Sequence, residues 1–234
     1  MQRIFPICLK DLKDYFYSPI AYIIISIFIL ISGWFFFSTF FILNQASLRD
    51  FFELLPITMS FIVPAITMRS FSEEFSIGSY EILATFPVKL NDIIFGKFLA
   101  LCCFIFFMLL PTLFFPISIS FIGNIDWGPV ICGYIGAFLL GISYASIGLF
   151  ASSLTKNQIN AFIIGSLICI LLSLMDKLLL FMPESVVTFF NYLSSNFHFQ
   201  NFSKGLFDIR DVIYFFSIIF IFLYATNISL SYRK

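Results

Sequence analysis

Long runs of apolar residues alternate with short polar segments along almost the whole chain. A transmembrane helix needs roughly 20 mostly apolar residues, because the hydrocarbon core of a bilayer is about 30 Å thick and a helix rises about 1.5 Å per residue. The runs are apolar on every face, which favours a helical bundle over the alternating strands of a membrane barrel. The pattern predicts six spans, at Ile20–Leu43, Leu54–Met68, Phe98–Ile122, Val130–Leu154, Ile159–Leu180 and Val212–Ser231.

Three segments outside these spans have patterns of their own. In residues 1–18, apolar side chains gather near one face of a helix and Lys10, Lys13 and Asp14 on another. This favours a helix lying in the membrane interface; the alternative is a charged flank that only sets orientation. Residues 69–97 form a long polar loop. Residues 182–211 form a second loop, whose apolar piece is too short to span and suits a re-entrant or surface-lying helix.

Composition agrees with a membrane protein. The 234 residues are 60% hydrophobic, 21% aromatic and 11% charged, with a mean hydropathy of +1.01. A soluble domain carries about 25% charged residues, so this chain has too few to cover a surface in water. Thirteen basic and thirteen acidic residues cancel, which excludes the basic excess of a nucleic-acid-binding protein. We therefore expect an all-α integral membrane protein with a single domain over residues 1–234.

The distribution of lysine and arginine predicts the orientation, because these residues collect on the cytoplasmic side of membrane proteins. With the N-terminus in the cytoplasm, nine of the thirteen lie inside. The four outside are Arg49, Lys177, Lys204 and Arg210. Both termini are therefore expected in the cytoplasm.

The side chains that catalysis or ion coupling would need are scarce. The single histidine, His198, lies in the outer loop, and Asp176 and Lys177 form a boundary pair that can reach the interface. Five cysteines without CxxC spacing predict buried free thiols rather than disulfides or a metal site. The G-x4-GK[ST] phosphate loop of ATP-binding proteins is missing. We expect no catalytic residue, no metal and no cofactor in this chain.

The loop at residues 69–97 carries the strongest local signals. Ser79 is placed to N-cap a short helix with Glu81 in its first turn, and Pro87 would end that helix. The apolar anchors of this helix would be Tyr80, Ile82, Leu83 and Phe86. Such anchors suit a groove on a partner protein; the alternative is that they rest on the membrane surface.

Eight residues of the loop follow the spacing R-x3-E-x4-G-x2-E-x-L-x3-P-x8-G-K: Arg69, Glu73, Gly78, Glu81, Leu83, Pro87, Gly96 and Lys97. This pattern resembles the cytoplasmic-loop signature of type-2 ABC exporter permeases, most of all the gliding-motility-associated permeases. A second matching cluster follows near the end of the chain: His198, Phe199, Phe202, Gly205, Asp208, Arg210, Asp211, Val212 and Tyr214. The resemblance covers nearly the whole chain.

The resemblance implies a six-span permease subunit in the bacterial cytoplasmic (inner) membrane. It implies an N-terminal interfacial helix, a coupling helix between spans two and three, and short outer helices between spans five and six. Such permeases act as homo- or heterodimers with two separate cytoplasmic ATPase subunits, which bind ATP and Mg and drive alternating access. An auxiliary extracytoplasmic subunit and membrane lipid are further partners that it suggests.

The resemblance also implies roles for individual residues. The ATPase-coupling loop would comprise Arg69, Glu73, Gly78, Ser79, Glu81, Leu83, Phe86, Pro87, Gly96 and Lys97. The outer gate would comprise His198, Gly205, Asp208, Arg210, Asp211 and Tyr214. Prolines 64, 111 and 116 would let spans two and three bend.

Two ion pairs are expected from the residues themselves. Arg69 should pair with Glu73 one turn later if the helix continues, or else contact lipid phosphate. Arg210 should pair with Asp208 or Asp211 at the start of the last span. Two other functions stay open: a non-transporting membrane anchor that recruits a soluble enzyme, and a secondary carrier that works without an ATPase.

Overall fold

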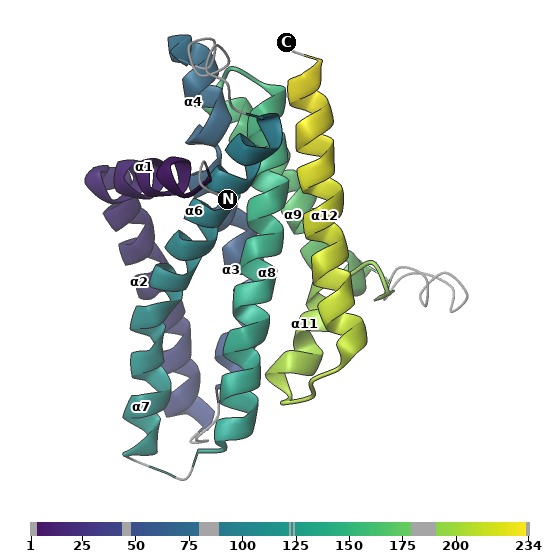
Figure 1. Ribbon diagram of the computed structural model, residues 1–234. Helices are drawn as coiled ribbons and strands as arrows, with labels where there is room; N and C mark the ends of the chain where they lie inside the picture. The colour runs from purple at the N-terminus through teal and green to yellow at the C-terminus, as the bar shows by residue number, and fades with distance from the viewer. Residues whose placement is uncertain are drawn as a thin grey trace.

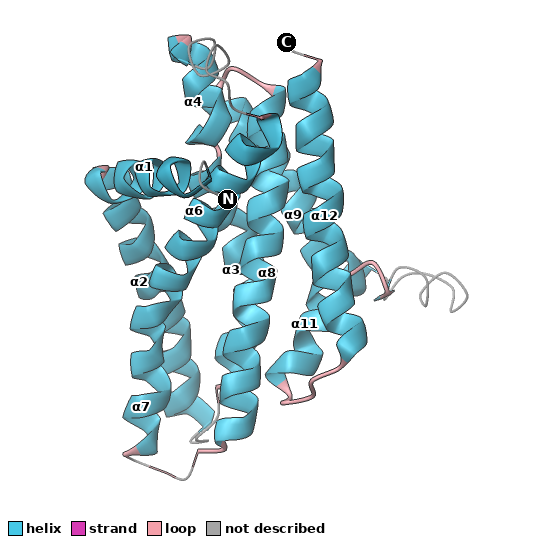
Figure 2. Cartoon of the chain, in the orientation of Figure 1, coloured by secondary structure: helices cyan, strands magenta, loops and turns pink. Residues whose placement is uncertain are grey.

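The computed structural model describes residues 4–43, 48–79, 89–121, 123, 125–178 and 191–232, and within them the regular structure is entirely helical (Figure 2). Six helices or helix pairs are long and apolar enough to cross a membrane. They are α2 (Pro19–Leu43), α3 (Arg49–Thr67) with α4 (Arg69–Ile77), α6 (Leu90–Leu109) with α7 (Phe114–Ser120), α8 (Trp127–Leu154), α9 (Gln158–Leu178) and α12 (Ile209–Ser231). The predicted set of six apolar helices is confirmed.

Several of these helices begin earlier than the apolar runs indicate, and α3 and α6 do so by the largest margin. α3 begins at Arg49 instead of Leu54, and α6 begins at Leu90 instead of Phe98. Each added first turn contains an aspartate, which the positive end of a helix dipole stabilises. Polar first turns are therefore part of the helices, although hydropathy alone assigns them to loops.

Two further helices among the described residues are too short to span. α1 (Ile4–Tyr17) lies crosswise to the long helices and packs against α2 and α6 (Figure 1). α11 (Ser195–Ser203) packs against α3, α8, α9 and α12. In Figure 1, α4 and the C-terminal end of α12 lie at one end of the bundle, and α7 and the start of α8 at the other.

α8 is the central helix of the bundle. It contacts α3, α4, α6, α9, α11 and α12, and most of its length is buried, whereas α2, α9 and α12 keep most of their surface exposed. Large side chains of neighbouring helices pack onto its glycines: Phe52 onto Gly133, Phe202 onto Gly136 and Ile105 onto Gly141. Small residues allow this approach, on which helix association within a bilayer depends.

The break between α3 and α4 is fixed by one hydroxyl group of α8. Ser152 Oγ accepts hydrogen bonds from the backbone N–H groups of Phe71 (2.9 Å) and Ser72 (3.0 Å). The same hydroxyl donates to the carbonyl of Met68, the residue between the two helices, at 3.0 Å. The backbone groups that the break would leave unpaired are thus satisfied from α8.

The expected bend in the third span lies at Pro111. There α6 gives way to a 3₁₀ turn, η1 (Leu110–Leu113), before α7 continues. The hydroxyl of Tyr134 on α8 donates to the carbonyl of Thr112 in this turn at 2.8 Å. In a regular helix the Thr112 carbonyl would accept from the residue four positions later, which is Pro116 and has no N–H, so α8 supplies the donor that this proline lacks.

The contact between α3 and α8 is tight enough to test. A Cβ atom at Gly148 would lie 2.8 Å from Cβ of Thr67, and closer still to its Oγ1. We expect Gly148→Ala to lower the free energy of unfolding by about 1–3 kcal/mol through overpacking. Unfolding followed by heat or denaturant in detergent micelles measures the loss.

Gly33→Ala is the matched control, because its Cβ would meet only the ring of Phe115 at an ordinary 3.6 Å. Alanine forms helix more readily than glycine, so this variant should be at least as stable as the wild type. Equal stability of the two variants would contradict the close α3–α8 contact.

Candidate functional site

Gly96 allows α1 to lie directly on the beginning of α6. A Cβ atom at this position would come within 2.8 Å of the Ile7 Cγ2 and 3.3 Å of the Ile4 carbonyl oxygen. Further along α1, the rings of Tyr15 and Phe16 pack on Phe104 at centroid distances of 5.6 and 5.7 Å. The glycine and the aromatic contacts together hold α1 across α6.

Lys97 follows this glycine and forms a buried ionic cluster. Its Nζ donates to Glu74 Oε1 of α4 at 2.7 Å and lies 3.3 Å from Asp11 Oδ2 of α1. The Lys97 side chain is only 4% exposed, and its Nζ stands 5.1 Å from the centre of the Phe71 ring. We call Asp11, Glu74 and Lys97 the Lys97 cluster.

The Lys97 cluster ties three helices together because a buried charge is tolerated only with close partners. Lys97 is on α6, Asp11 on α1 and Glu74 on α4. Moving either carboxylate away would leave the ammonium group partly unpaired in a dry environment. The relative positions of the three helices are therefore coupled at this point.

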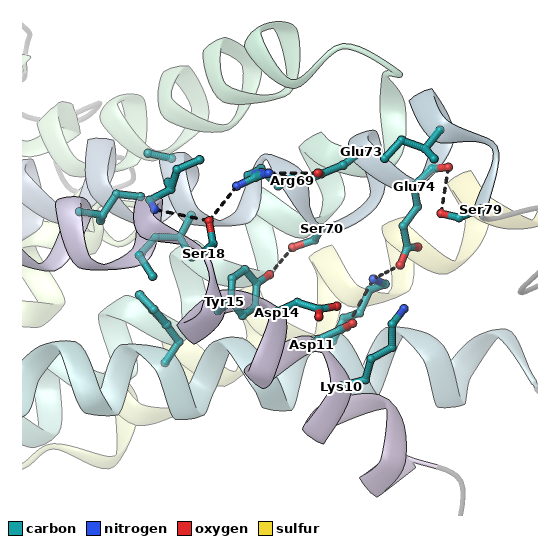
Figure 3. Close-up of a pocket in the computed structure, with 18 residues that line it drawn as sticks. Lys10, Asp11, Asp14, Tyr15, Ser18, Arg69, Ser70, Glu73, Glu74 and Ser79 are labelled. Carbon is teal, nitrogen blue, oxygen red and sulfur yellow. Dashed lines mark hydrogen bonds and ion pairs between the residues drawn. The ribbon is translucent and has the colours of Figure 1, made fainter.

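A second row of contacts runs beside the Lys97 cluster (Figure 3). The hydroxyl groups of Tyr15 and Ser70 are 2.8 Å apart and join α1 to α4. Burial raises the pKa of Tyr15 to about 12, so this phenol stays neutral at physiological pH.

Arg69 joins the same row and forms the expected ion pair with Glu73. Its Nε and Nη2 donate to the two Glu73 carboxylate oxygens at 2.8 and 3.0 Å, and its Nη1 donates to Ser18 Oγ at 3.3 Å. The prediction of an i,i+4 pair is confirmed. The contact with Ser18 adds a link to the beginning of α2.

These residues surround a cavity of about 290 Å³ between α1, α2, α3, α4 and α6. Its walls are polar on the side of α1 and α4, and apolar where α2 and α3 contribute Ile20, Ile24 and Ile66. Figure 3 shows Ser18, Arg69 and Ser70 toward one end of the cavity and Asp11, Glu74 and Ser79 toward the other.

The structure brings six of the expected loop residues to this region. Arg69, Glu73, Gly96 and Lys97 lie as described, and Gly78 ends α4 with a left-handed φ of 79°. Ser79 donates from its Oγ to the Glu74 carbonyl at 3.5 Å. Its expected N-cap role involves residues 80–88, which lie outside the described residues, as do Glu81, Leu83, Phe86 and Pro87.

Asp11 and Glu74 were missed by the sequence analysis. A signal for Asp11 was present, because it shares a helical face with the apolar residues Ile4, Ile7 and Cys8. An acid on the apolar face of an amphipathic helix needs a buried cation as its partner. Glu74 follows Glu73 directly, and no local pattern separates their roles.

Three of the six expected outer-gate residues, His198, Asp211 and Tyr214, form a second group around the imidazole of His198 on α11. Its Nδ1 lies 2.5 Å from Asp211 Oδ1 of α12, and its Nε2 lies 3.1 Å from the Tyr192 carbonyl oxygen. Asn201 donates to Asp211 Oδ2 at 2.9 Å, and the Tyr214 ring stacks on the imidazole at 4.0 Å. We call His198, Asn201, Asp211 and Tyr214 the His198 cluster; it holds α11 against α12.

The expected ion pair of Arg210 is wrong. Within the described residues, Asp211 faces His198 and Asn201, and Asp208 N-caps α12 by accepting from the backbone N–H of Arg210 at 2.9 Å. The Arg210 side chain is exposed. The Asp208 and Asp211 carboxylates thus accept from donors that the fold holds in place. The flexible guanidinium group of Arg210 does not displace these donors.

Two other expectations on this side have different outcomes. Gly205 makes the sharp turn between α11 and α12 with a φ of 80°, as predicted. Of the expected boundary pair, Lys177 is exposed, whereas Asp176 is half-buried and its Oδ2 accepts from Asn196 Nδ2 of α11 at 2.7 Å. Among the residues that the structure describes, no three histidine, cysteine or acidic side chains gather to hold a metal ion.

No protein-family model matches the sequence, and a search of the curated proteins finds no significant match. The function is therefore argued from the two clusters. Neither contains a nucleophile next to a general base, and both join helices that are distant in sequence. Their chemistry suits mechanical connection.

The Lys97 cluster makes a direct prediction about stability. Lys97→Met leaves the Asp11 and Glu74 carboxylates buried without a cation, so the free energy of unfolding should fall by about 3–5 kcal/mol. Lys89→Met is the control, because Lys89 is exposed one residue before α6 and its loss should change little. Thermal unfolding in micelles compares the two.

The triple variant Asp11→Asn/Glu74→Gln/Lys97→Met removes all three charges and should recover most of the stability lost by Lys97→Met. A triple variant no more stable than Lys97→Met would mean that packing, and not charge, is lost with Lys97.

The His198 cluster predicts an energetic coupling between α11 and α12. A double-mutant cycle with His198→Gln and Asp211→Asn should give a coupling of about 1.5–3 kcal/mol, the range for hydrogen bonds to charged groups. The control cycle uses Arg49 and Glu53, an i,i+4 pair with half-exposed side chains, for which about 0–1 kcal/mol is expected. Additive effects of the His198 and Asp211 substitutions would contradict the cluster.

Proposed function

We propose that this chain is the permease subunit of a type-2 ABC exporter in the bacterial cytoplasmic membrane. In this proposal a separate ATPase binds and hydrolyses ATP, and residues 69–97 carry the resulting movement into the spans. The observation that carries the proposal is the ion pair between Glu74 and Lys97. It closes the loop at residues 69–97 by joining its two ends.

A loop closed in this way would transmit a movement of residues 80–88 to both neighbouring helices. Residues 80–88 leave from α4 and return to α6, and the 2.7 Å contact holds those two helices together at the base of the loop. A displacement of the segment by a docked protein would therefore move α4 and α6 as a pair. Asp11 passes the same displacement to α1 through its contact with Lys97.

The connections of α4 and α6 give this displacement a route into the bundle. α4 joins α3 through the break at Met68, which Ser152 holds against α8. α6 leads to the 3₁₀ turn at Leu110–Leu113, which Tyr134 holds against α8. Both spans next to the loop thus have a bend that is hydrogen-bonded to α8. In alternating access, the two spans would rotate about the bends at Met68 and at Leu110–Leu113.

The proposed orientation places α4, residues 80–88 and both termini in the cytoplasm. It rests on the nine-to-four distribution of lysine and arginine and on the position of α4 and the end of α12 at the same end of the bundle (Figure 1). α1 would then lie in the cytoplasmic interface, and residues 80–88 would be the coupling helix. α11, at a distance from α4, would be an outer helix that gates release.

The proposal includes the partners of this chain. Two cytoplasmic ATPase subunits would bind ATP and Mg, and a second permease subunit, identical or different, would complete the transport path. An auxiliary extracytoplasmic subunit could dock on the outer side. The chain itself would contribute no catalytic residue and no cofactor.

The test is recovery of the ATPase with a loop variant. Leu83→Ala/Phe86→Ala should lower co-purification of a P-loop ATPase at least tenfold, since truncating interface hot spots costs about 2 kcal/mol or more. The control Leu206→Ala/Phe207→Ala changes the same residue types at an exposed pair between α11 and α12, and should retain the ATPase. Affinity purification from membranes at native expression, followed by mass spectrometry, measures both.

Undiminished recovery with the loop variant would contradict docking at residues 80–88. Recovery of an ATPase whose hydrolysis rate is the same with and without the wild-type chain would favour a membrane anchor. Substrate movement by the purified chain in vesicles without any ATPase would favour a secondary carrier.

A further inference from the structure

Both ring nitrogens of His198 face hydrogen-bond acceptors. Nδ1 lies 2.5 Å from the Asp211 carboxylate oxygen Oδ1, and Nε2 lies 3.1 Å from the backbone carbonyl oxygen of Tyr192. A neutral imidazole has one N–H group and one unprotonated nitrogen, which can only accept. In either neutral tautomer of His198, the lone pair of one ring nitrogen would therefore point at an oxygen lone pair.

We propose that His198 is a doubly protonated imidazolium in this structure, and that loss of one proton releases the segment before α11. An imidazolium donates from Nδ1 to Asp211 and from Nε2 to the Tyr192 carbonyl, so both contacts become hydrogen bonds. The proton between Nδ1 and Oδ1 stays on the imidazole, because Asn201 donates to Asp211 Oδ2 and stabilises the charged carboxylate.

The surroundings of the ring suit a buried cation. His198 is buried, and a buried charge is tolerated where a counter-ion and hydrogen bonds satisfy it. Asp211 supplies the counter-ion, with a donor on each of its oxygens. The Tyr214 ring stacks on the imidazole at a centroid distance of 4.0 Å, and the face of an aromatic ring attracts a cation. The protonated form thus gains from charge, hydrogen bonding and stacking.

Ionisable side chains on the other helices around α11 have partners of their own. Tyr144 of α8 is hydrogen-bonded to Ser195, and Asp176 of α9 accepts from Asn196. α3 packs the ring of Phe52 against α11. The carboxylate of the His198 cluster is therefore the ionised group that faces the imidazole within the described ranges.

Two stacked rings hold two consecutive backbone carbonyls just before α11. His198 Nε2 donates to the Tyr192 carbonyl, and the Tyr214 hydroxyl donates to the Leu193 carbonyl at 2.6 Å. The Nε2 contact is only partly buried, whereas the Nδ1 contact is buried, so the proton leaves to water from Nε2. The first of the two carbonyl contacts then becomes repulsive, and residues 191–194 separate from the ring.

The held form carries one proton more than the released form, so raising the pH favours release. A free imidazole loses this proton around pH 6.5, and above that pH the released form is neutral. The equilibrium constant for release should then rise by up to about tenfold per pH unit, the limit for one proton. If α11 faces the outer compartment, which rests on the proposed function, this contact responds to the acidity outside.

The protonation state can be measured directly, because His198 is the only histidine in the chain. The full chain, labelled with nitrogen-15 histidine and purified in micelles with a tag that lacks histidine, is studied by NMR. At about pH 7.5, where a free imidazole is mostly neutral, both ring nitrogens should give N–H signals. One unprotonated ring nitrogen in the wild type would overturn the proposal.

A matched pair of variants tests the role of the counter-ion. Asp211→Asn should leave one ring nitrogen unprotonated at the same pH. Asp208→Asn makes the same change at the N-cap of α12, where asparagine caps as well as aspartate, and should keep both N–H signals. Loss of the second N–H signal in both variants would contradict the role of the Asp211 contact. If Asp211→Asn does not fold, the wild-type spectrum still decides the protonation state.

Release is measured by hydrogen exchange of peptides covering residues 191–204, corrected for the pH dependence of intrinsic exchange. Between about pH 6.5 and about pH 8.5, opening of the wild type should increase at least severalfold, because one proton is lost. His198→Gln should show no such increase, since glutamine does not titrate. The same increase in both proteins, or none in the wild type, would overturn the proposal. Neither measurement involves an ATPase, so these outcomes are separate from those that test the proposed function.

Discussion

The ammonium group of Lys97 is the constraint on which the end of the bundle containing α1 and α4 depends. A lysine that is almost fully buried needs carboxylates at close range, and here they come from α1 and α4. Because Gly96 lets α1 approach α6, Asp11 can reach the lysine; because α3 and α4 are bent at Met68, Glu74 can reach it too. The Lys97 side chain thus fixes the positions of α1 and α4 relative to α6, and with them the base of the loop at residues 69–97.

The second constraint is that backbone groups inside a bilayer must be paired within the protein. Both helices next to the loop are broken, at Met68 and at Leu110–Leu113, and each break exposes backbone groups. α8 supplies the missing partners through Ser152 and Tyr134. Its glycines meanwhile let the neighbouring helices approach closely. Hence α8 provides both the close packing at the centre of the bundle and the hydrogen bonds that satisfy the broken helices. α2, α9 and α12 keep exposed apolar faces.

The two polar clusters divide the molecule into regions with different roles. The Lys97 cluster joins α4 to α6 at the base of the loop and lies beside a charged cavity. The His198 cluster holds the short helix α11 to the beginning of α12, and Asn196 extends it to α9. Between the clusters, apolar helices with two bends connect one region to the other. In the proposed exporter, the first region would receive the movement of the ATPase, the bent helices would transmit it, and the second region would respond on the far side.

The number and the approximate limits of the apolar helices could be predicted from the sequence, because hydropathy and the length of a span are local properties. The Arg69–Glu73 pair and the turn at Gly205 could be predicted too, since both depend on residues within one turn. The burial of Lys97 between Asp11 and Glu74, and the contact of Asp211 with His198 instead of Arg210, could not be predicted without the folded structure. These partners lie on different helices. How closely the helices pack decides which carboxylate reaches which cation, and no single segment of the sequence encodes that packing.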